Sequence, residues 1–72
     1  MTPKLTKARR TCVRFFTDNG PIALWPIGLF SSATRRRCEA EGLIETAGRE
    51  SGVFGLTKFV ATDKGRRALE ES

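Results

Sequence analysis

One segment, VFGLTKFVAT at residues 53–62, constrains the fold of this 72-residue chain more than any other. It is rich in β-branched and aromatic residues, which favour strands. We expect a strand at residues 56–61 that pairs back onto a second aliphatic stretch at residues 43–46. The turn material AGRESG, residues 47–52, lies between them, in a connection of about 8–10 residues. A chain of this length forms one small domain, so the other elements must share a core with this hairpin.

Before the hairpin, residues 4–18 have the spacing of an amphipathic helix. Thr2 or Thr6 can begin this helix. Its apolar stripe consists of Leu5, Ala8, Cys12, Phe15 and Phe16.

The sequence DNGP ends this helix, because Asn19 or Gly20 can take the left-handed cap conformation. We expect a short helix at residues 21–26, which begins at Pro21 and is stopped by Pro26. The apolar side chains of this region are expected to supply much of the core: Ile22, Leu24, Trp25, Ile27, Leu29 and Phe30.

A third helix is predicted at residues 32–42, within SSATRRRCEAEG. Ser31 or Ser32 is the N-cap candidate, and Gly42 supplies the stop. On a helix, successive side chains turn by about 100°. The three consecutive arginines of this helix are therefore not equivalent.

With Cys38 facing the core, Arg36 points almost directly away from it, while Arg35 and Arg37 project sideways. These arginines either grip an anion or form an ordinary solvated helix face. In the second case, pairs four residues apart are expected, from Arg35 to Glu39 and from Arg37 to Glu41.

The last predicted helix covers residues 62–71, with Thr62 as N-cap and with Ala68 and Leu69 buried. Gly65 is unusual inside a helix, because glycine disfavours helical geometry. The expected order is helix, short helix, helix, hairpin, helix, in the α+β class.

Charge is the strongest functional signal in the sequence. The formal net charge is +5, and the sequence pI is about 10.0. Residues 1–37 hold eight basic side chains against one acid, whereas residues 38–72 hold five against seven. Such segregation is typical of proteins that bind a polyanion, with nucleic acid favoured over a membrane surface or an acidic protein.

Several other functional classes are disfavoured by what the chain contains. It has no histidine and two cysteines, Cys12 and Cys38, too few ligands for a usual zinc site. Both thiols are expected to be reduced and buried. We predict no catalytic activity, cofactor or metal, because no nucleophile motif, glycine-rich phosphate loop or carboxylate pair is recognisable. No membrane helix or signal core is expected either, which predicts a soluble, cytoplasmic protein.

Two motifs resemble those of the winged helix-turn-helix fold, in families of the MarR and PadR type. RRRCEAEGLIE is similar to the end of a recognition helix that runs into the first strand of a wing. FVATDKGRRALEE is similar to the return strand and the following helix of the same families. Together with the order of elements, the likeness spans roughly residues 5–70. The fold expected from it is α+β, a winged helix-turn-helix with three helices, a two-stranded wing and a short C-terminal helix.

The chain also departs from these families. Ala61 stands where leucine is commoner, Cys38 replaces an aliphatic anchor, and Pro26 shortens the second helix. We expect this chain to lack the long dimerisation helices and the effector domain of many such repressors, so no small-molecule ligand is expected. Small phage- and plasmid-type regulators and excisionase-like proteins share this reduced form.

The resemblance implies that residues 32–42 are a recognition helix whose N-terminal half enters the major groove of DNA. Arg36 is then expected to contact a guanine edge, while Arg35 and Arg37 grip phosphates on either side. The small residues at the helix start that allow close approach to DNA are Ser32, Ala33 and Thr34.

The wing is expected at residues 43–61. Arg49, at its tip, would reach an adjacent minor groove or a phosphate, and Lys58 would contact the backbone. The alternative for Arg49 is a loop charge that keeps the hairpin tip soluble.

Three functions follow as hypotheses. The first is sequence-specific binding of double-stranded DNA by a small transcriptional regulator, as a homodimer or in cooperative arrays. The second is a protein-interaction module that binds a host protein such as a polymerase or nuclease. The third is an architectural, excisionase-like protein that bends DNA.

Overall fold

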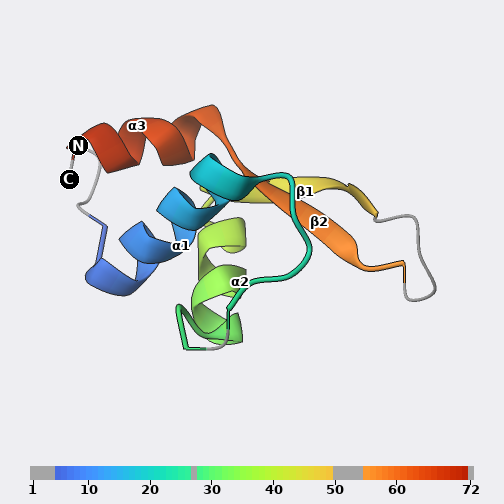
Figure 1. The fold of residues 1–72 in the computed structure, drawn as a ribbon. Helices are drawn as coiled ribbons and strands as arrows, with labels where there is room; N and C mark the ends of the chain where they lie inside the picture. Colours follow the sequence, from blue (N-terminus) through green and yellow to red (C-terminus); the bar gives the residue numbers. More distant parts are fainter. Residues whose placement is uncertain (1–4, 27, 50–54, 72) are drawn as a thin grey trace.

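The computed structural model describes residues 5–26, 28–49 and 55–71. Within them the chain has an α+β architecture with three helices and one two-stranded antiparallel hairpin (Figure 1). The elements in chain order are α1 (Lys7–Asn19), α2 (Ser32–Ala40), β1 (Ile44–Arg49), β2 (Thr57–Ala61) and α3 (Asp63–Glu71). The hairpin projects away from the helices as an arm (Figure 1). The predicted α+β class and the predicted hairpin are confirmed.

Helix α1 begins where Thr6 caps it, with the Thr6 hydroxyl accepting a hydrogen bond from the Arg9 amide at 3.3 Å. It ends at Asn19, with Gly20 as the C-cap. The prediction that Asn19 or Gly20 takes the left-handed conformation is wrong, because Asn19 does not have a positive φ and Gly20 is extended, with φ −72°. A Cβ built on Gly20 would lie 2.4 Å from the Phe16 carbonyl oxygen. The glycine is therefore required for close approach to the helix end rather than for an unusual backbone angle.

The prediction of a short helix at residues 21–26 is wrong, because these residues are not helical. Ile22 instead forms an antiparallel bridge with Phe59 of β2, and the two residues exchange both backbone hydrogen bonds, at 3.1 and 2.9 Å. Prolines at both ends, Pro21 and Pro26, leave too few amides for a stable helical turn. The backbone groups of Ile22 are satisfied by the neighbouring strand instead.

Helix α2 begins at the Ser31 N-cap, as one of the two predicted alternatives, and ends at Ala40, two residues before the predicted boundary. Gly42 has φ +78°, so the predicted left-handed stop is confirmed. The Gly42 amide donates to Glu39 and the Leu43 amide to Cys38, which is the hydrogen-bond pattern of a Schellman motif. This turn directs the chain straight from α2 into β1.

Strand β1 pairs with β2 in the register Ile44 to Ala61 and Thr46 to Phe59. It is longer than predicted, since it continues to Arg49 through part of the expected turn; the rest of that turn, residues 50–52, lies outside the described residues. The register shifts between Thr46 and Arg49, where Gly48 has φ +88°. This shift is a β-bulge.

Helix α3 starts at the predicted cap, where the Thr62 hydroxyl accepts from the Gly65 amide at 3.0 Å. The same hydroxyl donates to the Gly42 carbonyl at 2.6 Å, and the Thr62 amide donates to the Leu43 carbonyl at 3.0 Å. A Cβ built on Gly65 would lie only 2.1 Å from the Leu43 carbonyl oxygen. The glycine inside this helix lets α3 lie directly against the turn that follows α2.

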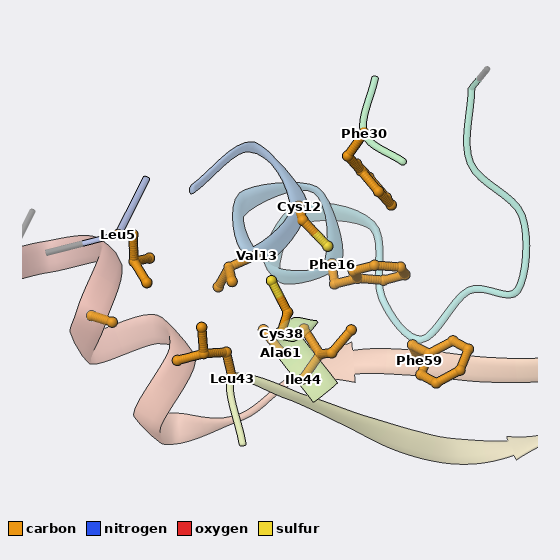
Figure 2. Close-up of a cluster of buried hydrophobic side chains, with 11 residues drawn as sticks. Leu5, Cys12, Val13, Phe16, Phe30, Cys38, Leu43, Ile44, Phe59 and Ala61 are labelled. Carbon is orange, nitrogen blue, oxygen red and sulfur yellow. The ribbon is translucent and has the colours of Figure 1, made fainter. Parts of the chain in front are cut away.

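In the described part of the chain, eleven buried side chains form the core between the helices and the hairpin (Figure 2). Phe16 is at its centre, with ring contacts to Phe15, Trp25, Phe30 and Phe59. The members of the core are Leu5, Cys12, Val13, Phe16, Phe30, Cys38, Leu43, Ile44, Phe59, Ala61 and Ala68.

Several core predictions need correction. Leu24 is 62% exposed, in a segment that is not helical as predicted, and Leu29 is 39% exposed, in a turn in which its amide donates to the Pro26 carbonyl. Ala8 is also exposed, whereas Val13, which was not predicted, is fully buried. Ile27 lies outside the described residues. None of the described helices has the length and apolar character needed to cross a membrane.

Candidate nucleic-acid interface

Helix α2 exposes two of its three arginines. Cys38 is fully buried, and Arg36, which lies on the opposite side of the helix, is exposed as predicted. Arg37 is exposed as well. Among the described residues, neither arginine has an ion-pair or hydrogen-bond partner. Both guanidinium groups are therefore available to an anionic ligand.

Arg35 differs from its neighbours because it is engaged within the molecule. Its guanidinium lies 4.5 Å from the centre of the Phe59 ring, and its Nη1 donates to Glu39 at 2.9 Å. Only 14% of its side chain is exposed. The cation–π contact links α2 to β2, and the ion pair, which lies within α2, orients the Arg35 side chain. The predicted pair of Arg35 with Glu39 is thus confirmed.

The other predicted pair, between Arg37 and Glu41, is wrong. Glu41 instead accepts two hydrogen bonds from Nη1 of Arg9 in α1, at 2.5 and 2.7 Å. The two partners are 32 residues apart, so no local pattern in the sequence predicts the pair. Because Arg9 of α1 binds Glu41, Arg37 is left without an acidic partner among the described residues.

The start of α2 is small and polar. Ser32 and Ala33 are exposed, so this end of the helix can lie close to a ligand surface. Thr34 is half-buried; its amide donates to the Ser31 hydroxyl at 3.1 Å, and its own hydroxyl lies 3.0 Å from that of Ser31. Thr34 therefore belongs to the helix cap more than to the exposed face.

The two candidate residues of the hairpin lie on different strands. Arg49 is exposed at the end of β1, in the pair position opposite Thr57. Lys58 is half-buried and is the neighbour of Thr57 in β2. Residues adjacent in a strand point to opposite faces of the sheet, so Arg49 and Lys58 are on opposite faces.

A second group of basic residues follows the outer face of α1. Lys7, Arg10 and Arg14 recur at helical spacing and are exposed, on the side opposite the buried Cys12 and Phe16. The sequence predicts this stripe only in general terms. Its outward position means that it adds positive charge without taking part in the core.

The two cysteines are free and fully buried, which agrees with the prediction of reduced, apolar thiols. They face one another between α1 and α2 (Figure 2). A hydrogen bond with Cys38, together with burial, raises the pKa of Cys12 far above its ordinary value, so this thiol stays protonated. In the described part of the chain, no three Cys, His, Asp or Glu side chains are grouped so that they could hold a metal ion.

Comparisons with known proteins find no similarity: no family model, no curated protein and no solved structure matches this chain. The arrangement of its own residues therefore carries any assignment. That arrangement is a short capped helix anchored by the buried Cys38 and by the contact of Arg35 with Phe59. Its outer face carries small residues and two arginines without a partner among the described side chains.

Proposed function

We propose that this protein binds double-stranded DNA in a sequence-specific manner, as a small transcriptional regulator whose α2 enters the major groove. The observation that carries this proposal is the presence on one short helix of two exposed arginines, Arg36 and Arg37, that have no ion-pair partner in the part of the chain that the structure describes. The basic excess of residues 1–37 supports it, because positive potential attracts phosphates.

The order of elements supports a winged-helix architecture for this activity. Helix α2 leads through a tight turn into the hairpin of β1 and β2, as a recognition helix leads into a wing. The bridge of Ile22 with Phe59 adds a third short segment beside β2. The first helix of a helix-turn-helix pair is replaced by the extended segment at residues 21–26. The positioning of α2 would then depend on α1 and the hairpin.

Each arginine of α2 is assigned a separate role. Arg36 lies opposite the buried side and is the candidate for a bidentate contact with guanine O6 and N7. Arg37, on the flank, is the candidate for a phosphate contact that positions the helix. Arg35 acts as a positioning residue, since its guanidinium already stacks on Phe59.

A DNA-selection experiment at fixed salt, followed by fluorescence anisotropy on the selected duplex and on a random one, tests the proposal. We expect Arg36→Ala to lower the preference for the selected duplex, by about 10-fold or more. Arg37→Ala should weaken both duplexes by a similar factor. Arg67→Ala, which removes an exposed charge of α3, is the matched control. Absence of binding to any duplex at low salt would refute the proposed function.

A second candidate, a protein-interaction module, is favoured by one observation. Within residues 5–26, 28–49 and 55–71, three large apolar side chains are exposed: Leu24 at 62%, Leu29 at 39% and Leu56 at 38%. Apolar side chains that gather into one contiguous exposed patch mark contact surfaces, whereas single exposed ones are normal. Replacing Leu24 by Ser should abolish capture of a stoichiometric partner from nuclease-treated lysate under this hypothesis. Under the DNA hypothesis the same substitution leaves affinity for the duplex unchanged.

A further inference from the structure

The bulge in β1 changes the face to which Arg49 points. Thr46 lies opposite Phe59, and Arg49 lies opposite Thr57. Two residues of β1, Ala47 and Gly48, therefore face the single residue Lys58. In a regular pairing that continued from Thr46, Gly48 would lie opposite Thr57, and Arg49 would be on the other face. The extra residue moves Arg49 to the face that Thr57 shares with Phe59.

Helix α2 packs on that same face. The ring of Phe59 lies under the guanidinium of Arg35, which comes from α2, at 4.5 Å. Cys38 of α2 is buried in one cluster with Phe59 and with Ala61, two positions further along β2. The face of the hairpin that carries Phe59 is therefore the face toward the core, on which both α2 and, through Phe16, α1 pack.

Gly48 makes the bulge possible. Its φ of +88° is one that L side chains rarely adopt, and a Cβ placed on it would meet no atom within 4 Å. The glycine is thus required by backbone conformation and not by packing. Glycine with positive φ at a bulge is a recognised way to redirect the next side chain.

We infer that the bulge is a positioning device that brings Arg49 onto the DNA-binding side of the molecule, where it contacts a phosphate of the same duplex that α2 binds. This inference rests on the proposed function. It also separates the two hairpin cations, because Lys58 is on the opposite face and takes no part in the contact.

The first experiment compares Arg49→Ala with Lys58→Ala by anisotropy on the selected duplex over a series of salt concentrations. Loss of one phosphate contact is expected to weaken binding about five- to tenfold and to reduce the salt slope by about 1. Arg49→Ala should show both effects, and Lys58→Ala neither. Equal effects of the two substitutions would overturn the inference.

The second experiment removes the bulge in two ways. Gly48→Val keeps the strand length but disfavours positive φ, so regular pairing moves Arg49 to the other face. Deletion of Gly48 removes the extra residue, yet Ala47 then faces Lys58 and Arg49 still faces Thr57. Cross-strand amide NOEs report which register each variant adopts, and thermal unfolding reports whether it folds.

Addition of Arg49→Ala to each background completes the test. It should have no effect on affinity in the Gly48→Val background and should retain its five- to tenfold effect in the deletion background. An equal loss in both backgrounds, with the registers verified, would refute the role of the bulge. If the unaltered protein binds no duplex, the proposed function itself fails; if it binds and only these contrasts are absent, the inference on Arg49 fails alone.

Discussion

Helices α1 and α2 belong to the same core but contribute to it very differently. α1 buries Cys12, Val13 and Phe16, whereas α2 buries only Cys38. The other side chains of α2 take part in its N-terminal cap, form the Arg35–Glu39 ion pair within the helix, or are exposed. The difference indicates that α1 contributes mainly to the stability of the domain, whereas most side chains of α2 lie on the surface. Substitutions in the two helices should therefore separate stability from binding.

The largest expected effect comes from α1. Phe16→Ala removes the ring that contacts four other aromatic residues at the centre of the core. We expect a loss of about 3–5 kcal/mol in the free energy of unfolding, enough to unfold much of a domain this small. Urea denaturation followed by circular dichroism measures it. A loss below about 1 kcal/mol would contradict the central place given to α1.

The next largest effect is expected where α3 meets the turn after α2. Gly65→Ala places a methyl group against the Leu43 carbonyl, where the structure leaves only 2.1 Å. We expect a loss of about 1–3 kcal/mol, even though alanine favours helices over glycine. Ala68→Gly, which acts on the same helix without adding volume, is a useful comparison in the same denaturation assay. A stabilising effect of Gly65→Ala would show that α3 does not lie against this turn.

A smaller effect is expected from the contact that links α2 to the hairpin. Arg35→Ala removes the stacking on Phe59 and the pair with Glu39, with an expected loss of about 1 kcal/mol. Arg35→Lys keeps the charge but not the planar stacking, so it should recover only part of the loss. Thermal unfolding of both variants measures the difference. Full recovery by lysine would mean that charge alone holds this residue.

The smallest effect on stability is expected from the exposed face of α2. Arg36→Ala and Arg37→Ala remove side chains without a partner among the described residues, so the melting temperature should not change measurably. Binding of duplex DNA should fall in the same samples. If either substitution destabilises the protein as much as Arg35→Ala, the division between a structural α1 and a presenting α2 is wrong.

The sequence predicts the parts of this fold that depend on neighbouring residues. Ser31, Gly42 and Thr62 cap or stop their helices as expected, because each acts on amides and carbonyls within a few positions. The outward position of Arg36 follows from helical periodicity once Cys38 is placed inside.

What the sequence did not predict depends on partners far along the chain. Ile22 is extended because Phe59 offers it two backbone hydrogen bonds, and Arg37 is unpaired because Arg9 binds Glu41. The bulge next to Arg49 likewise requires the register of both strands. Apolar composition alone predicted burial for Leu24 and Leu29, but composition does not tell which side chains of a non-helical segment or a turn meet the core.

Thr62 and Lys64 donate hydrogen bonds to the end of α2, so the proposed DNA-binding helix depends on residues of α3 and its cap. The Gly42 carbonyl is bound by a residue 20 positions later, and the Glu41 carbonyl by Lys64, 23 positions later. A fragment that stops before Thr62 would contain all of α2 and the hairpin, yet it would leave these acceptors to water. The smallest unit that keeps all hydrogen bonds at the end of α2 therefore extends into α3, and the final turn of α2 is completed by contacts from residues 20 and 23 positions later in the chain.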